Sequence, residues 1–288
     1  MSRRHEAAVL ASVLLGCTAG ASQPPAPATD PVSIAFPGQW APPPPDWKYP
    51  VFFSGCRRFR EPTERLACAE FILSDWPRLS RYAAANAALG PSRPGESRVV
   101  FFGDSITDNW SKPGYGGFFP GRPYVNRGIG GQTTAQMLAR FRADVVALGP
   151  KAVVILAGTN DVSGNNGPVG TASIQDNLAS MAELARVQGI RVVLASILPV
   201  TDDEKGTDGA PINRTRDRPP ETIAGINKWI AGYVAREGHV HLDYHTALAD
   251  VRGALRAELN DDGLHPNAAG YAVMAPLAEK AIAEALAR

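Results

Sequence analysis

The sequence of residues 98–107 is RVVFFGDSIT, an apolar, β-branched run that ends in a small polar cluster. Polar and apolar residues do not alternate within 99–102, which is typical of a strand buried on both faces of a parallel sheet. Runs of the same kind occur at 152–156 and 191–195, and we expect a fourth strand at 239–242. These segments predict the centre of an α/β fold.

Helical patterns follow these strands near 133–147, 171–188, 220–237 and 268–287. Strands that alternate with helices predict a parallel sheet covered on both faces. We therefore expect a three-layer α/β/α sandwich over residues 96–288. Two further helices, 61–73 and 76–89, are expected to form an N-terminal helical extension within residues 51–95.

The composition excludes several classes of protein. The 288 residues carry 29 basic and 28 acidic side chains, so a net charge of +1 gives no electrostatic footprint for nucleic acid. With 44% hydrophobic residues, the chain is too apolar to be disordered. Three cysteines without a C-x-x-C pair indicate neither a disulfide scaffold nor structural zinc.

The first 21 residues have the pattern of an export signal. Arg3 and Arg4 precede an apolar run at 7–16, which is about half the ~20 residues that a membrane-spanning helix needs. The run ends in Leu-Leu-Gly-Cys17, which resembles a bacterial lipobox and predicts lipidation of Cys17. Cleavage after Ala21 is the alternative; it would remove Cys17 and leave a soluble secreted protein.

Two segments follow the leader. Residues 22–50 contain ten prolines and are expected to form an extended tether between the leader and the folded part. Cys56 and Cys68 are the remaining cysteines, and in an oxidising compartment we expect them to form a disulfide. Two free buried thiols are the alternative.

Four loops at the expected carboxyl ends of strands contain polar side chains that could do chemistry. They are Gly-Asp-Ser-Ile-Thr (103–107), Asn-Arg-Gly-Ile-Gly-Gly-Gln-Thr (126–133), Gly-Thr-Asn-Asp (158–161) and Asp-Gly-Leu-His-Pro (262–266). Ser105 directly after a buried strand suits a nucleophile, and Asp262 three residues before His265 suits a base with its orienting carboxylate. Glycines before a helix expose N–H groups that suit an oxyanion, and Asn160 can donate from its side chain.

Each loop also has a purely structural interpretation. Ser105 could cap a helix, the glycines could form a tight turn, Asn160 could close an Asx-turn, and His265 could lie in a surface turn. Thr107 replaces the second glycine of a G-x-S-x-G elbow, which argues against an α/β-hydrolase.

Taken together, the four loops resemble the SGNH hydrolases, also called GDSL esterases, in order and context. The resemblance extends over residues 98–287. Two positions depart from the family pattern: Ile106 stands where leucine gives the family its name, and Gln132 stands where an acidic residue is frequent.

The resemblance implies a catalytic triad of Ser105, Asp262 and His265, with no cofactor and no metal. It implies an oxyanion hole made by the backbone N–H groups of Ser105 and Gly131 and the side chain of Asn160. Asp261 is adjacent, but the D-x-x-H spacing selects Asp262.

Another group of residues could instead bind a metal. These residues alternate along an expected strand, so that they could share one face: His239, His241, Asp243 and His245. However, Asp243-Tyr244 resembles a strand-end segment that carries no metal role in this family.

The sequence thus predicts an exported serine esterase of the periplasm or cell envelope that hydrolyses small O-acyl groups. The loops at 103–110, 128–134 and 158–162 resemble those of bacterial family members associated with acetyl esters of carbohydrates, which implies such esters as substrates. A lysophospholipase-like or aryl esterase is the alternative. A non-catalytic carbohydrate-binding protein on the same fold is an alternative of another class.

Overall fold

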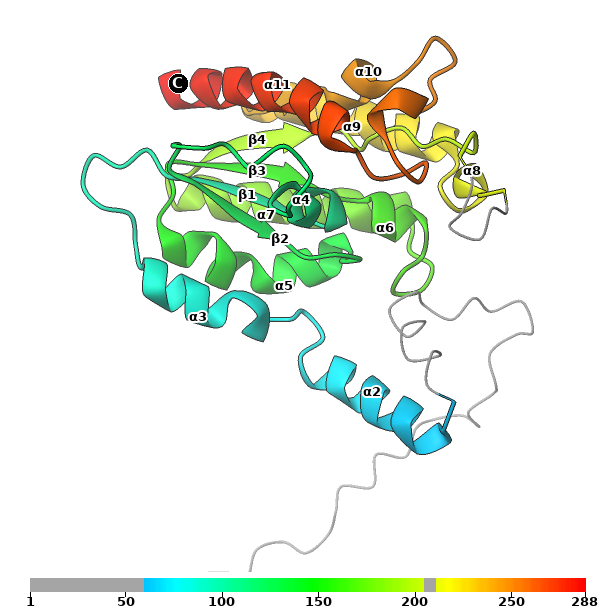
Figure 1. Cartoon of the computed structure of the whole chain (residues 1–288). Helices are drawn as coiled ribbons and strands as arrows, with labels where there is room; N and C mark the ends of the chain where they lie inside the picture. Colours follow the sequence, from blue (N-terminus) through cyan, green and yellow to red (C-terminus); the bar gives the residue numbers. More distant parts are fainter. Residues whose placement is uncertain (1–59, 205–210) are drawn as a thin grey trace, which may run out of the picture. The chain divides into compact units, whose positions relative to one another are not determined.

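The computed structural model describes residues 60–204 and 211–288 (Figure 1). A five-stranded parallel sheet lies at its centre in the order β2-β1-β3-β4-β5. The strands are β1 (Val99–Gly103), β2 (Tyr124–Gly128), β3 (Ala152–Leu156), β4 (Arg191–Ala195) and β5 (Val240–Leu242). Helices cover both faces, so the predicted three-layer fold is confirmed.

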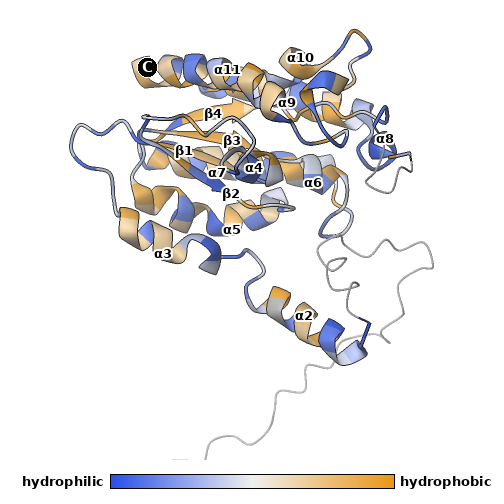
Figure 2. Ribbon diagram, in the orientation of Figure 1, coloured by the Kyte–Doolittle hydropathy of each residue, from blue (hydrophilic) through white to orange (hydrophobic). Residues whose placement is uncertain are grey.

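The long helices divide between the two faces of the sheet. One face is covered by α5 (Thr134–Asp144), α7 (Thr171–Val187) and α9 (Pro220–Glu237). The other is covered by α4 (Ser105–Trp110), α10 (Tyr244–Leu248) and α11 (Ala268–Ala287). The remaining helical elements are α2 (Pro62–Ser74), α3 (Ser80–Leu89), α6 (Thr159–Val162), α8 (Arg214–Asp217), η2 (Val146–Leu148) and η3 (Ala257–Leu259). In Figure 2, β4 between the two layers is coloured as hydrophobic.

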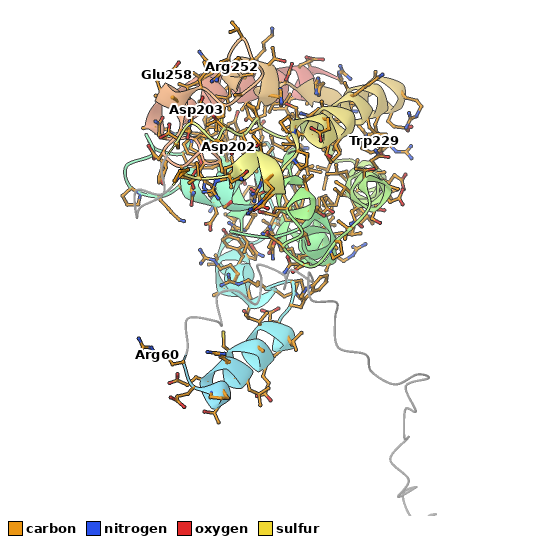
Figure 3. The ribbon with its side chains drawn as sticks, turned by 90° about the vertical axis from the view of Figure 1, so that its right-hand side faces the viewer. Arg60, Asp202, Asp203, Trp229, Arg252 and Glu258 are labelled. Carbon is orange, nitrogen blue, oxygen red and sulfur yellow. The ribbon has the colours of Figure 1, made fainter. Side chains whose placement is uncertain are left out.

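The strand order places a topological switch point at β1. The chain passes from β1 to β2 on one side and then to β3 on the other, and sheets of this kind bind ligands beyond the carboxyl ends of the strands at such a point. Figure 3 views the molecule from the side on which the strands end. At that end, Arg252 forms an ion pair of 2.5 Å with Asp203, one of several charged side chains labelled there.

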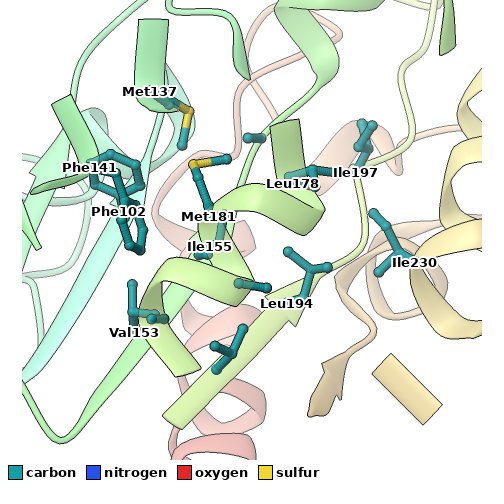
Figure 4. Packing of buried hydrophobic residues seen from close by; sticks show 14 of the residues in the cluster. Phe102, Met137, Phe141, Val153, Ile155, Leu178, Met181, Leu194, Ile197 and Ile230 are labelled. Atoms are coloured by element: carbon teal, nitrogen blue, oxygen red, sulfur yellow. The ribbon is translucent and has the colours of Figure 1, made fainter. Parts of the chain in front are cut away.

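The central strands β1, β3 and β4 pack alternate side chains into two separate cores. Val100 and Phe102 of β1 belong to the cluster formed with α5, α7 and α9, part of which Figure 4 shows. Val99 and Phe101 belong to the cluster formed with α4, α10 and α11. All four side chains are at most 3% exposed, which explains why the strand is apolar throughout.

The strand β2 is not among the strands predicted from the sequence. Its carboxyl half was interpreted as a loop because Asn126 and Arg127 interrupt any apolar run. As an edge strand, β2 has a partner on only one side, and its first residues are only half-buried. The polar residues are therefore compatible with the sheet.

The N-terminal extension contains the helices α2 and α3. The second begins at Ser80, not at residue 76, because Pro77 and the positive φ of Arg78 (57°) interrupt it and the Asp75 carboxylate accepts the Leu79 and Ser80 N–H groups. Cys68 lies in α2 and is disulfide-bonded.

Several predictions concern residues outside the described ranges. The leader, the tether, Cys17 and Cys56 all lie there, so lipidation of Cys17 and the pairing of Cys56 with Cys68 remain predictions. Over 60–204 and 211–288, no helix combines the length and the apolarity needed to cross a membrane.

Candidate active site

Ser105 lies where β1 turns sharply into α4. The turn requires a glycine, because a Cβ atom at Gly103 would lie 2.1 Å from Thr107 Oγ1 and 2.9 Å from the Leu156 carbonyl oxygen. Asp104, and not Ser105, caps the helix: its Oδ1 accepts the Ile106 N–H at 2.9 Å. Ser105 is the first residue of α4, and its hydroxyl is not used for the cap.

His265 and Asp262 lie in a compact turn that we call the histidine loop (residues 260–266). Asp262 Oδ1 accepts the N–H groups of Leu264 and His265 at 3.0 and 2.8 Å. Gly263, which follows Asp262, has a φ of +77°, and a Cβ there would lie 2.3 Å from the Thr201 carbonyl oxygen. The loop therefore fixes the carboxylate and the imidazole relative to each other.

The histidine loop places the imidazole between a hydroxyl and a carboxylate. His265 Nε2 lies 2.9 Å from Ser105 Oγ, and His265 Nδ1 lies 2.8 Å from Asp262 Oδ2. Burial alone would raise the pKa of Asp262, but the hydrogen bonds and charge of His265 and the charge of Arg214 hold that pKa well below its usual range. An ionised Asp262 only accepts, so when the His265 ring is in its neutral form its proton resides on Nδ1.

A second loop faces the same serine; we call it the glycine loop (residues 128–133). A Cβ at Gly130 would lie 3.8 Å from Ser105 Cβ, which shows how closely the loop approaches the hydroxyl. Gly131 adopts a φ of +79°, and the Gly130 N–H donates to Asp108 Oδ2 at 3.3 Å. Within the described chain, the N–H groups of Ser105 and Gly131 donate to no protein acceptor.

Asn160 reaches the glycine loop from the end of β3. It is the second residue of α6, and the turn before it needs Gly158, whose φ is +117°. The side chain is 3% exposed, and its Nδ2 donates to the Gln132 carbonyl oxygen at 3.0 Å. The structure thus brings together the six groups singled out in the sequence: three side chains of a hydrogen-bonded relay and three potential oxyanion donors.

Two further carboxyl groups are buried near the site. Burial raises the pKa of Asp104 and of Asp161 to about 6 each. Asp161 accepts from the N–H and the hydroxyl of Thr134, at the start of α5. Asp104 Oδ2 has no hydrogen-bond partner among the described residues.

The rival histidine cluster does not assemble into a metal site. Asp243 caps α10 by accepting the Thr246 N–H, and it also accepts the Ser196 hydroxyl. His239 packs against the Tyr233 ring at 5.9 Å. Among residues 60–204 and 211–288, no three His, Cys, Asp or Glu side chains are grouped so that they could hold a metal ion.

Sequence reasoning missed the supports behind the site. Arg214 donates to the Asp262 carbonyl oxygen at 2.9 Å and to its Oδ2 at 3.1 Å. Gln132, treated only as a departure from the family pattern, accepts from the buried Arg140 at 2.5 Å. No local pattern marks these residues, because their partners are distant in the sequence.

Comparisons with known proteins show the family of this chain. The model of the GDSL-like lipase/acylhydrolase family matches residues 101–273, more than half of the chain. The chain is 38% identical to a GDSL-like lipase from Bacteroides thetaiotaomicron, whose crystal structure superposes with a TM-score of 0.65 over 73% of this chain and 98% of that chain.

Two curated proteins are also similar. One is the uncharacterised lipoprotein YqeF of Bacillus subtilis, 28% identical over 59% of this chain and 72% of its own length. The other is the esterase TesA of Pseudomonas aeruginosa, 44% identical over 25% of this chain and 35% of its own length. The resemblance inferred from the four loops is confirmed, and the chain belongs to the GDSL-like lipase/acylhydrolase family of SGNH hydrolases.

Proposed function

We propose that this family member is an exported serine esterase that removes small O-acyl groups, acetyl above all, from carbohydrates through an acyl-enzyme. The observation that carries the proposal is the continuous relay from Ser105 Oγ to His265 Nε2 (2.9 Å) and from His265 Nδ1 to Asp262 Oδ2 (2.8 Å). A neutral imidazole with its proton on Nδ1 presents the Nε2 lone pair to the hydroxyl, as a general base must.

In the proposed acylation, Ser105 Oγ attacks the ester carbonyl while His265 Nε2 accepts the hydroxyl proton. Asp262 stabilises the resulting imidazolium and keeps the ring oriented. The leaving alcohol then takes the proton from Nε2, and the acyl group remains on Ser105. In deacylation a water molecule gives its proton to His265 and attacks the acyl carbon, which releases the acid and restores the hydroxyl.

The negative charge that develops on the carbonyl oxygen needs donors placed in advance. We assign this role to the N–H groups of Ser105 and Gly131 and to Asn160 Nδ2. Both N–H groups lack an acceptor in the described chain, as expected for donors that wait for a substrate oxygen. Asn160 is buried and already held against the glycine loop, so little reorganisation is needed.

Export and lipid anchoring of the mature protein belong to the same proposal. The leader pattern ending in Cys17 supports them, as does the similarity to a protein named as a lipoprotein. Mass spectrometry of the mature N-terminus tests this: a diacylated Cys17 is expected, and an unmodified chain beginning after Ala21 would contradict lipidation.

The test of the function is an ester panel with the purified full chain and its Ser105→Ala variant. The wild type should hydrolyse p-nitrophenyl acetate, and the variant should lose more than about 10³-fold of kcat while unfolding at the same temperature. Acetyl esters should be cleaved at least about 10-fold faster than octanoyl esters, and acetylated xylan in preference to lysophosphatidylcholine. Preference for the lysolipid would instead support the lysophospholipase-like function.

A further inference from the structure

The segment formed by residues 76–89 lies outside the residues that the family model matches, yet it contacts the active-site loops. Its helix α3 lies beside α5 (Figure 1), and the Pro77 carbonyl group in the short stretch before it accepts a hydrogen bond from the glycine loop. Residues 101–273 make the relay and the donors, so the role of this segment is not explained by the chemistry alone.

The most direct contact joins the backbone of the segment to Gln132. The Pro77 carbonyl oxygen accepts Gln132 Nε2 at 2.8 Å. The other half of the same amide, Oε1, accepts Arg140 Nε at 2.5 Å. Gln132 is 1% exposed and Arg140 is fully buried, so water is unavailable to replace either bond.

Gln132 also connects this support to the donors of the oxyanion hole. It directly follows Gly131, and its carbonyl oxygen accepts Asn160 Nδ2 at 3.0 Å. A shift of Gln132 would therefore move the N–H group of one donor and the side chain of another together.

Other residues of the segment hold the opposite end of the loop. The Tyr82 hydroxyl donates to the Gly128 carbonyl oxygen at 2.5 Å, and the Arg127 guanidinium lies 4.7 Å from the centre of the Tyr82 ring. Arg127 Nε donates to Asn86 Oδ1 at 2.7 Å, and Asn86 Nδ2 donates to Asp144 Oδ1 at the same distance. The segment thus forms hydrogen bonds with both ends of the glycine loop.

We propose that Gln132 is a positioning residue through which residues 76–89 hold the glycine loop and Asn160 in place for the oxyanion. This inference rests on the proposed esterase function. The two contacts also require an amide at position 132, because the side chain donates to Pro77 and accepts from Arg140. A carboxylate could accept from Arg140, but it has no N–H for the Pro77 carbonyl oxygen and would place a negative charge against it.

The test uses Gln132→Glu in the full chain, with p-nitrophenyl acetate as the substrate. The variant keeps the acceptor for Arg140, loses the donor to Pro77 and places a negative charge against the Pro77 carbonyl oxygen. Because the oxyanion exists only near the transition state, kcat should fall about 10-fold while KM changes less than about 3-fold. Tyr82→Phe, which removes only the bond to Gly128, should lower kcat in the same way by about 3-fold.

Gln136→Glu is the matched control. Gln136 Nε2 donates to the Trp76 carbonyl oxygen at 2.8 Å, and its Oε1 accepts the Thr133 N–H in the capping box of α5. Glutamate preserves the capping box and loses one bond to the same segment, but it does not contact Asn160. Its kcat should stay within about 2-fold of wild type.

A double-mutant cycle separates positioning from general loss of structure. In an Asn160→Ala background, Gln132→Glu should have a smaller effect on kcat, because one of the two donors that it positions is absent. An undiminished 10-fold loss in that background, or wild-type kcat in both Gln132→Glu and Tyr82→Phe, would overturn the inference. An inert wild-type enzyme would instead contradict the proposed function, which Ser105→Ala reports separately.

Discussion

The glycine loop and the histidine loop face the same serine, but the side chains that hold them differ in exposure. The glycine loop is held by Gln132 and by the Arg140–Asp144 ion pair, whose two side chains are 0% and 1% exposed. The histidine loop is held by Arg214, whose ion pair joins side chains 30% and 37% exposed. Water can replace the hydrogen bonds that Arg214 makes to the histidine loop, but it cannot replace those of Gln132 and Arg140 behind the glycine loop.

The difference matches what each loop has to do. The proposed oxyanion donors act by geometry, and buried hydrogen bonds fix geometry because breaking one leaves a polar group without a partner. His265 must instead accept and release a proton in each half-reaction, and its orientation is already set by bonds within its own loop. We therefore expect substitutions behind the glycine loop to cost more than those behind the histidine loop.

The largest effect is expected for Arg140→Met, measured as the free energy of unfolding in urea. The substitution leaves Asp144 without its cation and removes the donors to Gln132, to the Arg127 carbonyl and to the Gly103 carbonyl. Breaking a buried pair in this way costs about 3–5 kcal/mol. Arg214→Met, the equivalent change on the other loop, should cost less than about 1 kcal/mol, and equal losses would contradict the comparison.

The second prediction concerns catalysis on the glycine-loop side. Asn160→Ala should lower kcat about 10²-fold with little change in KM, because the amide stabilises charge that is absent from the bound substrate. Asn166→Ala is the control, since Asn166 Nδ2 donates to Thr133 Oγ1 and reaches the loop without facing the oxyanion. A change confined to KM would make Asn160 a ground-state binding residue.

The sequence was sufficient for the relay because each of its parts is local. A buried apolar strand predicts β1 and hence the position of Ser105, and the spacing of Asp262 and His265 predicts a turn that pairs them. The apolar runs of β1, β3 and β4 likewise predict the centre of the sheet. These features depend on neighbours a few residues away, which a single sequence displays.

The supports could not be predicted because they depend on pairs far apart in the chain. Pro77 and Gln132 are 55 residues apart, and Arg214 and Asp262 are 48 apart. The edge strand β2 was missed for a related reason: its polar residues bind partners such as Asn86 that only the folded chain brings near. A buried arginine such as Arg140 has the same appearance in the sequence as an exposed one.

The third prediction uses pH to compare a buried carboxyl group with a partly exposed one. The folded pKa of Asp104 is about 6, above its unfolded value of 3.8, so the stability it contributes is present below pH 3.8 and is lost as the pH rises through 6. Asp262, whose folded pKa is lowered, has the opposite sign: its contribution is present above pH 3.8 and is lost as the pH falls.

Asp104→Asn isolates the first of these terms. Asparagine keeps the cap on the Ile106 N–H through its Oδ1 and cannot ionise. Its free energy of unfolding relative to wild type should therefore increase with pH, reaching a gain of up to about 2–3 kcal/mol near pH 8. Urea unfolding of both proteins at several pH values measures this, and a difference that does not vary with pH would contradict it.

The smallest effect is expected for Arg214→Gln, at the exposed support of the histidine loop. Glutamine loses the charge beside Asp262 Oδ2, but the Leu264 and His265 N–H groups still hold Oδ1, so kcat/KM should fall no more than about 5-fold. Arg216→Gln is matched to it on the same short helix, since Arg216 forms an ion pair with Asp217 and does not touch Asp262.

Salt provides a second measurement, because an exposed ion pair is screened by salt. The difference in kcat/KM between wild type and Arg214→Gln should narrow at about 0.5 M NaCl, while the effect of Asn160→Ala should not change. A loss in Arg214→Gln as large and as salt-independent as that in Asn160→Ala would mean that exposure does not decide how strongly each loop depends on its support.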